Sequence, residues 1–88
     1  MDNVISIERG VNVYPNPFSS SATVIVTGAD ITNGTDFILT DVFGKEVKNI
    51  KLSTSNFKLE RSELPSGIYF YKVNDVNGIV GAGKIVME

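Results

Sequence analysis

Short runs of β-branched and aromatic residues, each ended by turn-forming residues, follow one another along nearly all of this 88-residue chain. No window keeps an apolar period of 3.6 residues, so the pattern predicts strands and little or no helix. The predicted strands span residues 11–14, 22–27, 36–41, 45–52, 57–60, 68–73 and 79–87. About seven short strands at this spacing predict an all-β, immunoglobulin-like β-sandwich of antiparallel strands.

Turn-forming residues separate these runs. Asp41-Val42-Phe43-Gly44 predicts a hairpin in which Gly44 supplies a positive φ angle. Asn77-Gly78 is the strongest two-residue hairpin signal in the chain. In Pro15-Asn16-Pro17 the two prolines fix two φ angles and remove two backbone donors, so this segment is predicted to be a turn or an edge.

Two of the strands have predicted places in their sheet. Residues 68–73 are apolar on both faces, which favours a central strand. Residues 80–87 come last, contain Gly81 and Gly83, and are predicted to lie at a sheet edge. An edge strand leaves backbone groups unpaired, so this edge would allow the addition of a further strand or the formation of a homodimer.

The composition argues against most kinds of catalytic and metal-binding chemistry. The sequence has no cysteine and no histidine, so it lacks the usual zinc and iron–sulfur ligands and the commonest general base at neutral pH. The serines have no histidine to activate them. The net charge is −2 and the lysines and arginines are scattered, which argues against a nucleic-acid partner. We therefore predict no enzyme, no cofactor and no metal centre.

One glycine-rich segment has the spacing of a phosphate-binding loop. Gly78 to Lys84 reads G-x-x-x-x-G-K, but the next residue is Ile85, where Ser or Thr would hold magnesium. No helix is predicted to follow and offer its N-terminal amides. The segment is therefore interpreted as a glycine-containing strand.

Acidic and amide residues gather in two loops. Asp30, Asn33 and Asp36 lie in or beside one loop, and residues 74–77 form the other. Their oxygens could bind calcium, but neither loop has the spacing of an EF-hand. Because Asn and Asp ordinarily stabilise turns, we predict turns and keep a weak calcium site as the alternative.

The three tyrosines have two interpretations. Tyr14, Tyr69 and Tyr71 would form a sugar-stacking platform if they shared an exposed face. However, Leu64-Pro65-Ser66-Gly67 precedes Tyr69 as a corner precedes a strand. This placement is typical of the tyrosine corner of immunoglobulin-like sandwiches, whose hydroxyl binds upstream backbone. We favour the structural role.

Four motifs carry a resemblance to a known family. They are Tyr14-Pro15-Asn16-Pro17-Phe18, Leu39-Thr40-Asp41-Val42-Phe43-Gly44-Lys45-Glu46-Val47, Leu64-Pro65-Ser66-Gly67-Ile68-Tyr69 and Gly83-Lys84-Ile85-Val86. In this order they make residues 11–88 resemble the C-terminal sorting domains of the type IX secretion system of Bacteroidota, the type A or Por secretion tail domains. The resemblance implies structural roles for Tyr14, Pro15, Asn16, Pro17, Phe18, Asp41 and Gly44.

The resemblance also implies a function. Such a domain directs a larger N-terminal passenger across the outer membrane, where the type IX translocon and its shuttle components recognise it. A sortase-like peptidase commonly removes the domain in the upstream linker, which here corresponds to residues 1–10. The passenger would carry its own N-terminal export signal, which these ten residues lack. The expected location is the periplasm in transit and then the cell surface or the extracellular medium.

We expect the recognised surface to lie at the last strand and the corner behind it. The residues assigned to it are Gly67, Ile68, Tyr69, Lys84, Ile85, Val86, Met87 and Glu88. The alternatives are an immunoglobulin-like accessory module for carbohydrate binding or adhesion, and a self-associating structural module similar to those of the flagellar hook-capping family. The first would need exposed aromatic residues on one flat face, and the second would need a large homo-oligomeric interface.

Overall fold

The computed structural model describes residues 10–88, except the side chain of Thr32. The predicted tether at residues 1–10 therefore lies outside the described residues, apart from Gly10, which already belongs to the first strand. The strands are β1 (Gly10–Tyr14), β2 (Ser21–Thr27), β3 (Asp36–Thr40), β4 (Glu46–Lys51), β5 (Asn56–Glu60), β6 (Gly67–Asp75) and β7 (Gly78–Met87). One 3-10 turn, Ile31–Asn33, is the helical content of the described residues, and no helix among them could cross a membrane.

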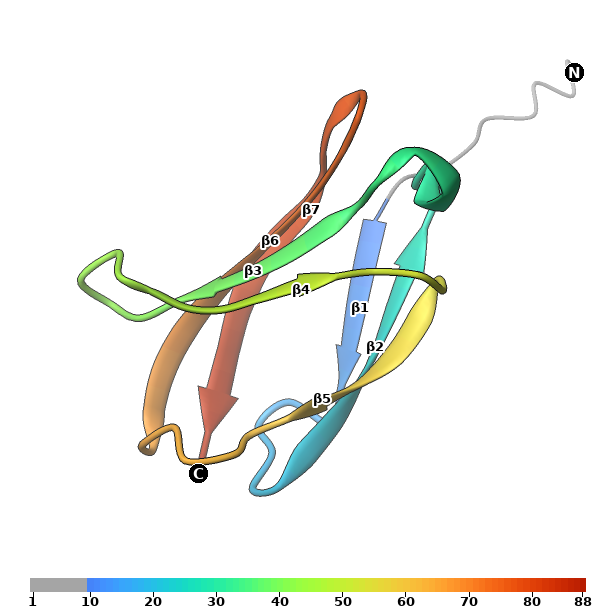
Figure 1. The fold of residues 1–88 in the computed structure, drawn as a ribbon. Helices are drawn as coiled ribbons and strands as arrows, with labels where there is room; N and C mark the ends of the chain where they lie inside the picture. Colours follow the sequence, from blue (N-terminus) through green and yellow to red (C-terminus); the bar gives the residue numbers. More distant parts are fainter. Residues whose placement is uncertain (1–9) are drawn as a thin grey trace, which may run out of the picture.

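The strands form two antiparallel sheets packed face to face (Figure 1). One sheet has the order β1-β2-β5, and the other has the order β4-β3-β6-β7. This arrangement confirms the predicted all-β, immunoglobulin-like sandwich. It also confirms that β6 is central and that β7 lies at the edge of its sheet.

The core lies between the sheets because strand residues alternate between two faces. In β2 the buried residues are Ala22, Val24 and Val26, and in β3 they are Phe37 and Leu39. Intervening residues of both strands are partly exposed. The full buried apolar set is Phe18, Ala22, Val24, Val26, Phe37, Leu39, Leu52, Leu59, Tyr69, Val73, Val80, Ile85 and Met87.

The outer face of β6 is apolar but not covered. Apolar residues on both faces predicted a central strand, and the position is central, but Ile68 and Phe70 on the outer face are 44% and 45% exposed. In a two-layer sandwich each sheet has only one covered face, so a central strand keeps one face in water. These apolar side chains are therefore not explained by burial.

Gly83 provides space for an aromatic stack inside the sandwich. Tyr71 lies opposite Gly83 in the β6–β7 register, and its ring stacks on Phe37 with centroids 5.8 Å apart. Phe37 in turn meets Phe57 edge-on at 5.3 Å. Burial raises the pKa of the Tyr71 hydroxyl above its ordinary value. A Cβ atom on Gly83 would lie only 2.7 Å from the Tyr71 hydroxyl oxygen and 2.8 Å from two ring carbons.

Gly83→Ala is expected to lower the free energy of unfolding by about 1–3 kcal/mol, because the added methyl group must displace a packed ring. Urea denaturation of the two proteins measures this difference. Gly10→Ala is the matched control, since nothing lies within 4 Å of its added Cβ. Equal losses in the two variants would contradict the packing argument.

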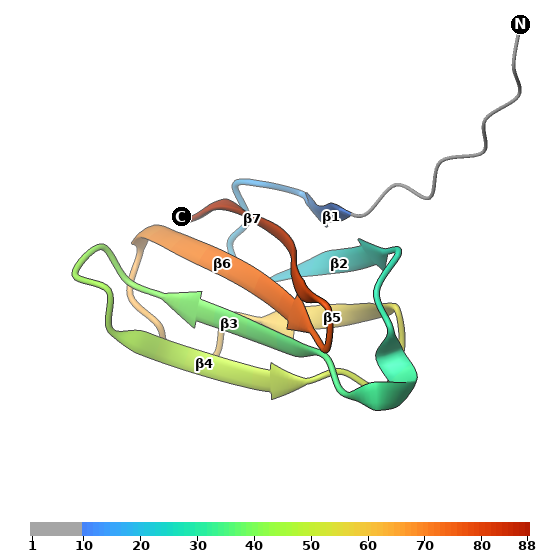
Figure 2. The same cartoon turned by 90° about the horizontal axis from the view of Figure 1, so that it is seen from above.

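The loops gather at two opposite ends of the sandwich (Figure 2). At one end lie the β1–β2 loop, the β3–β4 hairpin, the β5–β6 corner and the last residue, Glu88. The chain enters β1 at the other end, beside the 3-10 turn and the β6–β7 hairpin. We name the first of these the motif end, because all four sequence motifs reach it.

Candidate recognition surface

The side chain of Asn16 pairs with the outer backbone edge of β7. Its Nδ2 donates to the carbonyl oxygen of Lys84 at 2.8 Å, and its Oδ1 accepts from the amide of Val86 at 3.0 Å. A carboxamide carries the same donor and acceptor as a peptide group, so it can take the place of a neighbouring strand. The first motif of the sequence therefore binds the last one.

Phe18 continues this pairing toward the end of the chain. Its amide donates to the carbonyl oxygen of Val86 at 3.1 Å, and its carbonyl oxygen accepts from the amide of Glu88 at 2.9 Å. The Phe18 side chain lies in the core, 2% exposed. We name Asn16 and Phe18, with their four hydrogen bonds to β7, the clasp.

The clasp corrects one expectation. The edge position of β7 is right, but the outer backbone of residues 80–87 was expected to be unpaired. The Lys84 carbonyl and both backbone groups of Val86 are instead paired with Asn16 and Phe18. Pro15 and Pro17 flank Asn16 and carry no backbone donor, so the side chain of Asn16 makes the bonds instead. Strand addition at this part of the edge would first have to displace the clasp.

Arg61 joins three segments of the motif end. Its Nε donates to the carbonyl oxygen of Leu64 at 2.9 Å, and one terminal nitrogen donates to that of Ser19 at 3.0 Å and also to that of Glu88. The other terminal nitrogen donates to the Ser66 hydroxyl at 2.8 Å. Only an arginine offers enough donors in one plane for these acceptors.

Sequence reasoning missed Arg61. The available signal was an arginine placed shortly before the Leu64-Pro65-Ser66-Gly67 corner, in a chain whose other cations from Lys45 onward are all lysines. That signal shows a residue suited to several carbonyl acceptors, but it does not show which carbonyls are near.

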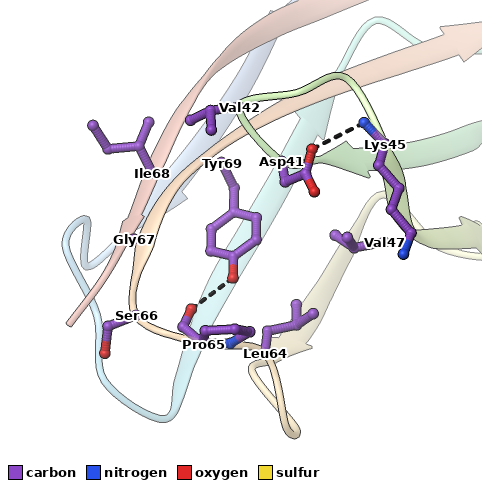
Figure 3. Close-up of a pocket in the computed structure, with 10 residues that line it drawn as sticks. All are labelled: Asp41, Val42, Lys45, Val47, Leu64, Pro65, Ser66, Gly67, Ile68 and Tyr69. Carbon is purple, nitrogen blue, oxygen red and sulfur yellow. Dashed lines mark hydrogen bonds between the residues drawn. The ribbon is translucent and has the colours of Figure 1, made fainter.

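Tyr69 fixes the corner between β5 and β6. Its side chain is 5% exposed, and its hydroxyl donates to the carbonyl oxygen of Pro65 at 2.6 Å (Figure 3). This is the hydrogen bond that the tyrosine-corner interpretation expects. Tyr14 is exposed and Tyr71 is stacked on Phe37 in the sandwich, so the three tyrosines form no common sugar-stacking platform.

Tyr69→Phe is expected to lower the free energy of unfolding by about 1–3 kcal/mol, because it removes the hydroxyl and leaves a corner carbonyl without its partner. Thermal or urea denaturation measures the loss. Tyr14→Phe removes the same atom from an exposed side chain and serves as the control. A loss as large in Tyr14→Phe would show that the corner bond is not the cause.

Asp41 organises the β3–β4 hairpin. Its Oδ1 accepts from the backbone amides of Phe43 and Lys45, each at 2.9 Å. Gly44 has a φ of 84°, as the predicted hairpin requires, and donates its amide to the Asp41 carbonyl oxygen at 3.0 Å. The carboxylate therefore holds the turn, and its neighbours Val42 and Phe43 project from it as exposed side chains.

A hollow of about 370 Å³ lies between this hairpin and the corner (Figure 3). Figure 3 shows the ring of Tyr69 between the two segments, with Val42 and Ile68 on one side and Val47 on the other. The remaining lining comes from Asp41, Lys45, Leu64, Pro65, Ser66 and Gly67. The second and third motifs thus meet in one open, largely apolar recess at the motif end.

The predicted recognition residues divide into two groups. Ile68, Lys84 and Glu88 are exposed, and Gly67 and Val86 are partly exposed. Tyr69, Ile85 and Met87 are buried, with at most 5% of their surface accessible. Because neighbouring strand residues point to opposite faces, a partner that docks on the folded domain touches only the first group.

The two acidic loops come together at the end opposite the motif end. The amide of Asp30 donates to Oδ2 of Asp75 at 2.9 Å, and Nδ2 of Asn33 donates to Oδ2 of Asp30 at 2.8 Å. Asp75 also accepts from the Asn77 amide at 2.8 Å. These carboxylates therefore stabilise the two turns. For the calcium alternative, residues 10–88 contain no group of three or more His, Cys, Asp or Glu residues that could hold a metal ion.

Comparisons with known proteins identify a matching sequence family and a solved structure of similar fold. The model of a family described as the secretion system C-terminal sorting domain matches residues 12–88. No curated protein matches the sequence. A solved structure of PorZ, a surface component of the type-IX secretion system of Porphyromonas gingivalis, has a similar fold, with a TM-score of 0.68 and 21% identity. The match covers 89% of this chain and only 11% of that protein.

Proposed function

Because this chain belongs to the family of secretion system C-terminal sorting domains, we propose that it directs a larger passenger protein across the outer membrane through the type IX secretion system. The match to residues 12–88 is the observation that carries this proposal, since it spans almost the whole sequence. Such a domain acts by being recognised, and sorting domains are typically not enzymes.

The proposed partners are the passenger and components of the type IX apparatus. The passenger precedes β1 in the chain, and β1 starts at the end away from the motif end. This geometry leaves the motif end free to meet the translocon or its shuttle components. In the proposed sequence of events, a sortase-like peptidase then cuts within residues 1–10, and the passenger is released or attached at the cell surface.

The recognised surface is proposed to be a folded surface at the motif end. Ile68, Lys84 and Glu88 are its exposed members from the predicted set. The clasp supports recognition through side chains, because it pairs the outer backbone of the last residues of β7. Tyr69, Ile85 and Met87 support this surface from the core beneath it.

A reporter fusion tests the proposed function. Residues 1–88 are attached to a fluorescent protein that carries an N-terminal export signal, in a bacterium with a type IX system. We expect the reporter at the surface or in the medium, and we expect it to be retained when the translocon is disabled. Retention in the periplasm of the intact strain would overturn the proposal.

A deletion tests the recognised surface within that assay. The fusion lacking Lys84 to Glu88 is expected to stay in the periplasm. Normal secretion of this shortened fusion would exclude these residues from the signal. N-terminal sequencing of the domain recovered from the medium tests peptidase removal, and a start outside residues 1–10 would place the cut elsewhere.

A further inference from the structure

Exposed apolar side chains concentrate near the motif end. Val42, Phe43, Ile68 and Phe70 are four of the seven large apolar residues that are exposed within residues 10–88. Val42 and Phe43 belong to the β3–β4 hairpin, and Phe43 is 91% exposed. Ile68 and Phe70 lie on the uncovered face of β6. We name these four residues the apolar ridge, and exposed apolar clusters of this kind mark interaction sites.

Three residues of the apolar ridge line two hollows. Val42 and Ile68 line the recess of about 370 Å³ described above. Phe70 lines a second hollow of about 290 Å³ on the outer face of the four-stranded sheet, with Ile38, Thr40, Tyr71, Lys72 and Ala82. Ile68 and Phe70 are two residues apart on one face of β6, so the hollows adjoin through them. The surface can therefore accept protruding side chains in both hollows.

Lysines border the apolar ridge. Lys45 lines the first hollow, Lys72 lines the second, and Lys84 lies beside Phe70 in the β6–β7 register. None of the three makes an ion pair with another described residue, whereas Lys51 and Lys58 do so elsewhere. The chain as a whole has a net charge of −2. The positive border is thus a local feature of this face.

Fewer acidic groups than lysines lie beside the ridge. Asp41 lines the first hollow, and Glu46 lies opposite Thr40 of the second. Asp36 pairs with Lys51 at 2.8 Å. The face therefore favours a partner that brings carboxylates of its own.

We infer that the apolar ridge is the docking face for a protein partner that inserts apolar side chains into the two hollows and surrounds them with Asp and Glu. This inference rests on the proposed function, so the partner is a component of the outer-membrane secretion apparatus. The hollows favour a protein over a lipid surface, because a fluid bilayer presents no fixed side chains to fill them. A second copy of the chain is disfavoured, since it would bring the same face, in which the three lysines outnumber Asp41 and Glu46, to the contact.

Matched substitutions in the secretion assay test the inference. Phe70→Ser and the pair Lys72→Glu with Lys84→Glu are expected to lower the secreted fraction by about tenfold or more, because each removes contacts at the centre or border of the interface. Val76→Ser and Ile79→Ser are the controls for Phe70→Ser, because they change exposed apolar residues of the β6–β7 hairpin at the other end of the sandwich. Lys58→Glu, on the other sheet, is the control for the lysine substitutions. Thermal melting of each purified variant separates lost recognition from lost folding.

Photo-crosslinking identifies the chemistry of the partner. A photoreactive residue replaces Phe43 in the secreted fusion, and a second fusion carries it at Val76. We expect position 43, and not position 76, to crosslink to an outer-membrane protein of the apparatus, at a segment rich in Asp and Glu beside apolar residues. A crosslink to lipid, to a second copy of this chain or to a basic segment would overturn the inference.

The two proposals fail in different ways. Retention of the wild-type fusion in the periplasm would overturn the proposed function itself. Secretion of the wild-type fusion together with equal secretion of the ridge variants and the control variants would overturn the docking face alone. Loss of secretion in folded ridge variants with normal secretion of the controls supports both.

Discussion

Phe18→Ala is expected to lower the free energy of unfolding by about 3–5 kcal/mol, the usual cost of removing a buried phenyl ring. This is the larger of the two strongest effects that the structure predicts. The ring lies in the core at 2% exposure, and the backbone of the same residue makes two of the hydrogen bonds to β7. The substitution therefore creates a cavity and loosens the last residues of the chain together.

Two measurements follow for this variant. Urea denaturation gives the loss of stability, and sedimentation tests for self-association through the exposed edge of β7.

Phe43→Ala is the matched control, because that ring is 91% exposed and its removal should change the free energy of unfolding by no more than about 0.5 kcal/mol. Phe18→Leu keeps part of the core volume and gives a folded variant if Phe18→Ala does not fold. Equal free energies of unfolding for the Phe18 and Phe43 variants would contradict the placement of the Phe18 ring in the core.

Arg61→Met is expected to lower the free energy of unfolding by about 2–4 kcal/mol, since each of several intramolecular hydrogen bonds contributes about 0.5–1.5 kcal/mol net. Methionine keeps the apolar stem of the side chain but removes every donor to Leu64, Ser19, Ser66 and Glu88. The loss measures how strongly the guanidinium ties the corner, the β1–β2 loop and the chain end together.

Arg61→Lys separates charge from geometry. Lysine keeps the positive charge but has one nitrogen, so it cannot reach acceptors on three segments at once. We expect an intermediate loss of stability, and faster hydrogen exchange at the amide of Glu88, whose carbonyl oxygen loses its contact. Wild-type stability in Arg61→Lys would show that charge alone accounts for the effect, and wild-type stability in Arg61→Met would contradict the role of Arg61 altogether.

The strands and their turns could be predicted because their signals are local. Alternation placed β2 and β3, and Gly44 marked the β3–β4 hairpin. Asn77-Gly78 marked the β6–β7 hairpin to within one residue, since Asp75 pairs with Gly78 and the loop is Val76-Asn77. The corner before Tyr69 was also readable, since its hydrogen bond spans four residues. These features depend on neighbours in sequence, which the sequence displays directly.

The clasp and the role of Arg61 could not be predicted in the same way. Asn16 lies 68 and 70 positions from the two groups that it binds, and Arg61 reaches residues on both sides of it in the chain. Which carbonyls face these side chains depends on how the sheets stack. The exposure of Phe70 likewise follows from the number of layers, because an apolar strand looks the same whether one face or both are covered.

The clasp makes the motif end depend on residues far apart in the chain. Asn16 and Phe18 precede β2, but the groups that they bind lie in residues 84–88. A chain that stops short of these residues can form most of both sheets and still lacks the closed end. Because Arg61 also contacts Glu88, a damaged or truncated product would differ from an intact one at the very surface proposed for recognition. An export apparatus that recognises this surface would thereby discriminate against products that have lost residues 84–88.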